Sequence, residues 1–229
     1  MSGNGGDTND ESESSYNTLL SSNKLIIGDS NGCRLKVSDR DIHNLSKSGA
    51  KLADVNKIIQ DSDVTNVDSV VIHLGTNNLK TMNRKSVTEN ATAALESVKS
   101  KWPNADVAFS SIIPRIGKTK TIKDHNSDAK QVNSDILNYC LTTQKFHYLD
   151  NDDIFYDENV PVKKLYDKED PSGVHINQAG ASALYKNVTG FLLGGISDES
   201  EMDTTRSKRL RSDGSVSSQE FRASKQSKK

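Results

Sequence analysis

The chain has 229 residues, of which 33% are hydrophobic, and its formal net charge is -1 at pH 7. This length suits one well-buried domain with tails and makes two full domains unusual, while the near-neutral charge excludes a chain that is basic throughout. The sequence shows no secretory signal and no apolar stretch long enough for a membrane span, so we expect a soluble, intracellular protein without membrane contact.

The two ends of the chain are poor in apolar residues. Residues 1–22 and 195–229 consist mainly of small, polar and charged residues, which bury too little apolar surface to offset the entropy of ordering them. We therefore expect disordered tails on either side of one domain at 23–194. The C-terminal tail is basic over 206–229. Its cluster at 206–211 indicates either a nuclear import signal or a nucleic-acid-binding arm, and a solvated tail of a cytoplasmic protein is the alternative.

The two cysteines, Cys33 and Cys140, lie far apart in a chain without an export signal. Reduced thiols are therefore expected. Neither cysteine has a second one at metal-ligand spacing, and the sequence predicts no metal and no cofactor. The acids Asp150, Asp152 and Asp153 lack the ligand spacing of a calcium loop, so a solvated turn is the simpler interpretation.

The apolar pattern predicts strands that alternate with helices. In chain order we expect a strand at 24–28, a strand at 41–45, a helix at 52–59, a strand at 68–74, a helix at 86–102, a strand at 106–113, a helix at 125–142, a strand at 146–149 and a helix at 177–193. Residues 150–173 show neither period, which indicates a long irregular segment. The alternation predicts an α/β protein, a parallel sheet covered by helices in a three-layer α/β/α sandwich.

Candidate site residues follow the ends of the predicted strands. Ser30 follows the first strand, Gly49 closes the loop after the second, Asn77 follows the third, and His175 precedes the last helix. Because the carboxyl ends of parallel strands meet at one edge of a sheet, we expect these residues to converge there. Acyl transfer needs a hydroxyl nucleophile, a base and donors for an oxyanion, and this set supplies all three.

In order and spacing, these residues resemble the sequence blocks of the SGNH hydrolases, also called GDSL-type esterases. The blocks are Gly28-Asp29-Ser30, Gly49 after Ser-Lys-Ser, Gly75-Thr76-Asn77 and Gly173-Val174-His175. The resemblance covers most of residues 23–193. It implies a flavodoxin-like fold with a five-stranded parallel sheet, Ser30 as nucleophile and His175 as general base. It also implies that Gly49, Asn77 and the backbone N–H of Ser30 form the oxyanion hole.

The chain departs from the family pattern beside the base. Family members place an Asp three residues before the base, and Ser172 occupies that position here. Asp170 lies two residues further back, across Pro171, and is the candidate to orient the imidazole, with a backbone carbonyl as the alternative. The third block ends in Asn78 where the family usually has Asp, and an amide is able to hold the same turn.

The resemblance implies a serine esterase that hydrolyses small, acetyl-like esters through an acyl-enzyme, weakened by Ser172. The alternative is a catalytically impaired binding module with the same fold. The Gly-Asp-Ser-Asn start and the low-complexity tails also resemble the esterase domains in first open reading frames of some non-LTR retrotransposons in animals. That resemblance implies contact between residues 206–229 and nucleic acid. The other expected partner is a small-molecule ester.

Other polar residues have structural interpretations. His73 lies within an apolar strand and is expected to be a hydrogen-bonded core residue, and His43 and His147 are interpreted in the same way. The connection at 115–123 holds Arg115, Lys118, Lys120 and Lys123. These cations indicate a loop that faces an anionic substrate group, and solvation alone explains them equally well.

Overall fold

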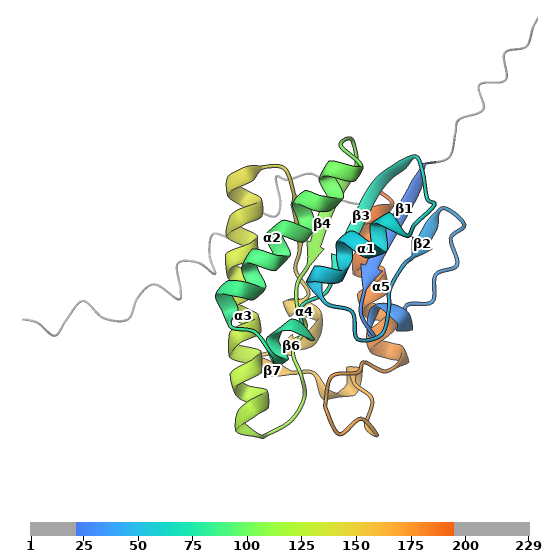
Figure 1. Ribbon diagram of the computed structural model, residues 1–229. Helices are drawn as coiled ribbons and strands as arrows, with labels where there is room; N and C mark the ends of the chain where they lie inside the picture. Colours follow the sequence, from blue (N-terminus) through green and yellow to red (C-terminus); the bar gives the residue numbers. More distant parts are fainter. Residues whose placement is uncertain (1–21, 195–229) are drawn as a thin grey trace, which may run out of the picture.

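Five parallel strands form the centre of the computed structural model, which describes residues 22–194 (Figure 1). They are β1 (Asn23–Gly28), β2 (Ile42–Asn44), β3 (Val67–His73), β4 (Asp106–Ser110) and β5 (His147–Leu149). Their order in the sheet is β2-β1-β3-β4-β5, and every neighbouring pair is parallel. The predicted flavodoxin-like α/β/α sandwich is therefore confirmed.

Helices cover both faces of this sheet. The helices α1 (Val55–Gln60), α2 (Arg84–Lys101) and α3 (Lys120–Thr143) lie on the near face in Figure 1, and α5 (Gln178–Leu192) lies behind the sheet. Side chains of β1 alternate between the two layers, since Leu25 and Ile27 pack in the cluster of α1 to α3 and Ile26 packs with α5. All three side chains are fully buried, which explains the unbroken apolar run in the sequence.

The fourth strand ends at Ser110, three residues before the predicted end. The backbone of Ile112 bonds to a side chain instead of a neighbouring strand. Its N–H donates to Asn133 Oδ1 at 2.9 Å, and its carbonyl accepts from Asn133 Nδ2 at 3.0 Å. A buried amide on α3 therefore takes over the pairing that a longer strand would have made.

The third helix begins at Lys120, five residues before the predicted start. Thr119 caps it, since its Oγ1 accepts a hydrogen bond from the Ile122 N–H. Lys120 and Lys123 therefore lie in the first turn of α3 and not in a loop as predicted. The buried face of α3 begins only after this first turn, so the apolar pattern of the sequence does not reveal it.

The sequence predicted that the segment 150–173 is irregular throughout. The structure contains short regular elements in it. It contains the short helix α4 (Asp152–Phe155), an antiparallel pair formed by β6 (Tyr156–Asp157) and β7 (Val160–Pro161), and a 3-10 turn, η4 (Lys163–Leu165). Phe155 is fully buried in the layer of α5. These elements are too short to produce a recognisable period.

The structure also tests the histidine predictions. His73 is buried and its Nδ1 lies 3.1 Å from Ser110 Oγ, which confirms a hydrogen-bonded core residue. His43 is half-buried and its Nε2 lies 2.9 Å from Asn23 Oδ1. The prediction for His147 is wrong, because its side chain is exposed at the edge strand β5, beside the Phe191 ring.

Some sequence predictions concern residues that the structure does not describe. Apart from Ser22, the tails predicted at 1–22 and 195–229 lie outside the described residues, as does the basic cluster at 206–211. Within residues 22–194, no helix is both long enough and apolar enough to cross a membrane.

Candidate active site

The turn that carries Ser30 follows β1 directly. Asp29 Oδ1 accepts a hydrogen bond from the Asn31 N–H at 2.9 Å, and the Asp29 carbonyl accepts from the Cys33 N–H at 2.9 Å. Gly28 sits against Ser46, since a Cβ at Gly28 would lie 2.7 Å from Ser46 Oγ. The chain is thus fixed on both sides of Ser30, whose side chain remains half-buried.

Asp29 belongs to the interior of this turn. Its side chain is buried, and burial raises its pKa above the ordinary value against the opposing effects of His73 and of the hydrogen bond from Asn31. Burial likewise lowers the pKa of His73, with Asp29 acting in the opposite direction. Since His175 is also among the groups that lower the pKa of Asp29, the base lies within electrostatic reach of this turn.

His175 is paired with Asp170. Its Nδ1 lies 3.0 Å from Asp170 Oδ2, and the Asp170 side chain is only 10% exposed. The same oxygen accepts hydrogen bonds from the backbone N–H groups of Val174 at 2.9 Å and His175 at 2.8 Å. Asp170 therefore holds both the ring and the backbone of the candidate base.

Ser172 supports this carboxylate. Its Oγ lies 2.7 Å from Asp170 Oδ1 and 2.9 Å from Oδ2, and its N–H donates to Oδ1 at 3.0 Å. Burial raises the pKa of Asp170, but the hydrogen bonds from His175, Ser172 and Val174 outweigh it and hold the pKa well below its usual range. The carboxylate is therefore ionised at neutral pH.

The loop around His175 is fixed by backbone contacts. The His175 carbonyl accepts from the Asp167 N–H at 2.9 Å, and Tyr166 forms an antiparallel bridge with Ile176. Gly173 has a φ of +63°, and its carbonyl accepts from the Ile116 N–H at 2.9 Å. A Cβ at Gly173 would overlap the Ile116 carbonyl oxygen, so the close approach of these two segments requires glycine.

Asn31 joins the Ser30 turn to the His175 loop. Its Nδ2 donates to the Val174 carbonyl at 3.1 Å, and its Oδ1 accepts from the Ile176 N–H at 3.1 Å. These two groups flank His175 in the chain, and the Asn31 side chain is 1% exposed. The sequence analysis predicted no role for Asn31, although this residue directly follows the candidate nucleophile Ser30.

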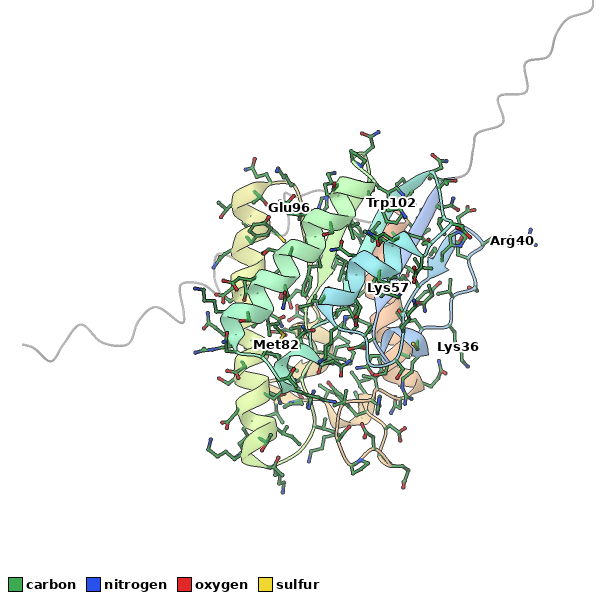
Figure 2. The ribbon with its side chains drawn as sticks, viewed as in Figure 1. Lys36, Arg40, Lys57, Met82, Glu96 and Trp102 are labelled. Carbon is green, nitrogen blue, oxygen red and sulfur yellow. The ribbon has the colours of Figure 1, made fainter. Side chains whose placement is uncertain are left out.

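The two loops that carry Gly49 and Asn77 are bonded to each other. Asn77 Nδ2 donates to the Ala50 carbonyl at 3.1 Å, and the Leu52 N–H donates to Asn78 Oδ1 at 3.1 Å. The amide of Asn78 thus supplies the acceptor that a carboxylate would supply, and its Nδ2 also lies 3.4 Å from Sδ of Met82, near the start of α2 (Figure 2).

The hydrogen bonds between these loops leave the candidate oxyanion donors available. Gly49 has a φ of +78°, and the space that a Cβ would occupy there is open. Across residues 22–194, the backbone N–H groups of Ser30 and Gly49 donate no hydrogen bond to the protein. Asn77 Nδ2 has a second proton beyond the one given to Ala50. The structure therefore leaves a donor on each of the three segments.

Sequence reasoning also missed the neighbours of Asn77. Arg115 Nη2 donates to the Thr76 carbonyl at 2.9 Å, and Thr76 Oγ1 lies 3.3 Å from Nε2 of His125. Arg115 had been considered only as one cation in a basic connection. His125 carried no signal, because it falls within the polar start of α3.

A hollow of about 280 Å³ opens beside Gly49 and Ala50. The Ile58 side chain contributes an apolar wall. Lys47, which precedes α1, and Lys57 of α1 lie at the border of the hollow, and Lys57 is labelled in Figure 2. Within the described part of the chain, no group of three or more His, Cys, Asp or Glu side chains is arranged to hold a metal ion.

Comparison with protein families gives one clear match. The model of the GDSL-like lipase/acylhydrolase family matches residues 4–183 of this chain. A comparison with curated proteins found no match.

Solved structures share the fold at low sequence identity. A protein from Streptococcus pneumonia, described as a candidate platelet activating factor, is 20% identical with a TM-score of 0.65, and the match covers 77% of this chain and 86% of that chain. A GDSL-like lipase from Bacteroides thetaiotaomicron is 19% identical with a TM-score of 0.60, covering 76% and 89%. These matches support the three-layer fold.

The esterase domain of the ORF1 protein from the zebrafish ZfL2-1 retrotransposon is also similar. It is 20% identical with a TM-score of 0.40, and the match covers 75% of this chain and 99% of that chain. This structural likeness is too low to support an argument about origin, so the relation to retrotransposons and the nucleic-acid contact of residues 206–229 stay predictions.

Proposed function

Because this chain belongs to the GDSL-like lipase/acylhydrolase family, we propose that it is a serine esterase of small carboxylic esters that works through an acyl-enzyme. The observation that carries the proposal is the 3.0 Å contact between Asp170 Oδ2 and His175 Nδ1. It supplies an orienting carboxylate although Ser172 stands where the family pattern has an Asp. Ser30, His175 and Asp170 are then the nucleophile, the general base and the positioning residue.

In the first half of the reaction, Ser30 Oγ attacks the ester carbonyl while His175 Nε2 accepts its proton. The Nδ1–H of the resulting imidazolium donates to the ionised Asp170, which stabilises the positive charge. The oxyanion receives hydrogen bonds from the backbone N–H groups of Ser30 and Gly49 and from Asn77 Nδ2. When the intermediate collapses, the C–O bond to the alcohol breaks and His175 returns the proton to the leaving oxygen.

The second half repeats these steps with water. His175 takes a proton from the attacking water, the oxyanion forms again on the same donors, and the bond to Ser30 Oγ breaks. The proton returns to Ser30, and the carboxylic acid leaves. Among the protein groups, only Ser30 and His175 change their covalent bonds or protonation, whereas Asp170, Gly49 and Asn77 act through hydrogen bonds.

The hollow adjoins the candidate oxyanion donor Gly49, and Ser30 and His175 are not part of its lining. At about 280 Å³ it lies just below the roughly 300–1,000 Å³ that is usual for ligand pockets. A substrate group that enters it from the side of Gly49 therefore has to be small.

The rival hypothesis is a catalytically impaired binding module, and it was motivated by Ser172. In the structure this serine donates to the carboxylate of Asp170 and does not replace it. The main reason to expect an orienting defect is therefore removed.

A fluorophosphonate probe tests the proposal on the folded, full-length chain. We expect covalent labelling of Ser30 and hydrolysis of p-nitrophenyl acetate, both lost in Ser30→Ala. The matched control is Ser100→Ala, an exposed serine on α2, which retains labelling. A folded chain that is neither labelled on Ser30 nor active on the acetate ester contradicts the esterase function.

A further inference from the structure

Arg115 is fixed between the two halves of the candidate site. Its backbone N–H donates to Asn126 Oδ1 and its carbonyl accepts from Asn126 Nδ2, both at 2.8 Å. The next residue, Ile116, donates to Gly173 in the loop of His175. The guanidinium itself reaches across to Thr76, the residue before Asn77. Arg115 therefore contacts the oxyanion turn and adjoins the base loop at the same time.

The guanidinium uses Nε and Nη2, and not Nη1, in these contacts. Nε and Nη2 both approach Thr76, with Nε 3.4 Å from Oγ1 and Nη2 3.2 Å from Oγ1 and 2.9 Å from the carbonyl oxygen. No other side-chain hydrogen bond of Arg115 is formed within residues 22–194. Nη1 is thus left with both of its protons for an acceptor oxygen of another group.

The charge of Arg115 is not neutralised by direct pairing. None of the ion pairs among the described residues involves it. Burial lowers its pKa, and the carboxylates of Asp29 and Asp170 act in the opposite direction, which shows that both lie within electrostatic reach. The lone pairs of Asp170, however, are already engaged by His175, Ser172 and Val174.

The titratable groups beside Thr76 and next to Arg115 along the chain add positive charge or none. His125 lies beside Thr76, and burial, Arg115 and Lys80 together lower its pKa to about 3, so it is neutral at physiological pH. Lys118 follows on the same connection and Lys123 lies in the first turn of α3, both with exposed side chains. A half-buried cation at the border of the site, without an ion-pair partner, is suited to an anionic ligand group.

We propose that Arg115 is a specificity-determining residue, and that the esters preferred by this site carry a carboxylate or phosphate group that binds its free Nη1 group. The inference deepens the proposed esterase function and rests on it for the reaction. Binding of the anionic group does not depend on turnover, so the two claims can be tested separately.

Matched substrates test the preference. We expect kcat/KM for 4-acetoxybenzoate to exceed that for its methyl ester about tenfold more in the wild type than in Arg115→Gln, since a hydrogen bond to a charged group supplies this magnitude. Comparison across variants cancels the intrinsic reactivity of the two esters. Arg115→Lys retains part of the preference, because it keeps the charge and loses the planar fork.

Two further variants separate recognition of the anionic group by Arg115 from its structural contact with the turn at Thr76. Thr76→Val removes the hydroxyl that holds Arg115 and is expected to lower kcat/KM for both esters by similar factors. Lys123→Gln, a nearby exposed cation, leaves the ratio unchanged. An equal ratio in wild type and Arg115→Gln overturns the inference. The pair 4-acetoxyphenyl phosphate and 4-acetoxyphenyl methyl ether shows whether phosphate is accepted in place of carboxylate.

Calorimetry with 4-acetamidobenzoate and its methyl ester measures binding without turnover. We expect the anion to bind Ser30→Ala about tenfold more tightly than the methyl ester, and the difference to vanish in Ser30→Ala/Arg115→Gln. If the wild-type chain hydrolyses no ester while Ser30→Ala still discriminates between the two compounds, the esterase function is contradicted and the inference on Arg115 stands. Absence of binding by either compound, or equal binding of both, overturns the inference.

Discussion

Asp170 Oδ2 lies 3.0 Å from His175 Nδ1 although Asp170 stands five residues before the histidine in the chain. The loop makes this contact possible, because Gly173 adopts a positive φ and the N–H groups of Val174 and His175 both turn toward the same carboxylate. In the proposed function, the orienting carboxylate therefore lies two positions before the place that the family pattern gives it, and Ser172 is one of its hydrogen-bond donors.

Asp170→Asn tests this relationship directly. The amide keeps the size of the side chain, but it no longer stabilises the imidazolium or selects the productive tautomer. We expect kcat for p-nitrophenyl acetate to fall on the order of 10⁴-fold, as in the serine-protease template, with a small change in KM. Steady-state kinetics measure this, and thermal unfolding verifies that the variant is folded.

Glu169→Gln is the matched control for that variant, because it removes the neighbouring, exposed carboxylate. It is expected to keep kcat within about twofold, as distant surface charges are screened. If Asp170→Asn were as active as this control, a backbone carbonyl and not Asp170 would orient the ring.

Ser172→Asp restores the residue that the family pattern expects, and we predict a loss of activity. Ser172 Oγ lies 2.7 and 2.9 Å from the two oxygens of Asp170, so a carboxylate there would face a second negative charge. Like charges at this distance raise the pKa of one member and remove a hydrogen bond from the other. Ser172→Ala, which loses only the hydroxyl, serves as the reference in the same ester assay. A gain of activity in Ser172→Asp would show that position 172 is the better orienting site.

The central fold was predictable because its signals are local. Leu25 to Ile27 and Val70 to Ile72 are fully buried on both sides of the sheet, and each reads as an unbroken apolar run. The ends of these strands then placed Ser30 and Asn77 at one edge. The start of α3 was missed because its capping residue, Thr119, precedes a turn in which Ile122 is the one apolar residue, and the buried side chains of the helix begin only at His125.

The connections within the site were not predictable in the same way. Asp170 was a candidate, but its contact with His175 depends on the backbone path through Pro171 and Gly173, which no period encodes. Asn31 and Arg115 act over separations of 143 and 39 residues. Such long-range hydrogen bonds between side chains and backbone leave no repeated pattern in one sequence.

Asn31→Ala tests the bridge between the Ser30 turn and the base loop. The change leaves the Val174 carbonyl and the Ile176 N–H without their buried partner, so we expect a loss of roughly 2–4 kcal/mol in the free energy of unfolding. We also expect kcat to fall, because His175 lies between these two groups. Urea denaturation and ester hydrolysis measure the two effects. Asn138→Ala, an exposed asparagine on α3, is the control, and equal stability of the two variants would remove the bridge from the account.

Gly173→Ala tests the close approach of the base loop to Ile116. The added methyl group overlaps the Ile116 carbonyl and the residue keeps a φ of +63°, so we expect a cost of about 3 kcal/mol or more. Gly194→Ala is the matched control, because Gly194 has a φ of +75° with open space around it. Its cost should stay near 1 kcal/mol. Similar urea midpoints for the two variants would show that the loop moves away from Ile116 without penalty.

His125→Gln tests the electrostatics beside the oxyanion turn. In the folded chain burial, Arg115 and Lys80 lower the pKa of His125 to about 3, whereas an unfolded histidine titrates near 6.5. Between these pH values the unfolded state binds more protons, so stability falls as the pH is lowered through this window. We expect the loss in unfolding free energy from pH 7 to pH 4 to be roughly 3 kcal/mol smaller in His125→Gln than in the wild type. Urea titrations at both pH values, with Lys123→Gln as a control on the same helix, measure the difference. An unchanged loss in His125→Gln would mean that His125 accepts a proton in the folded chain as readily as in the unfolded one.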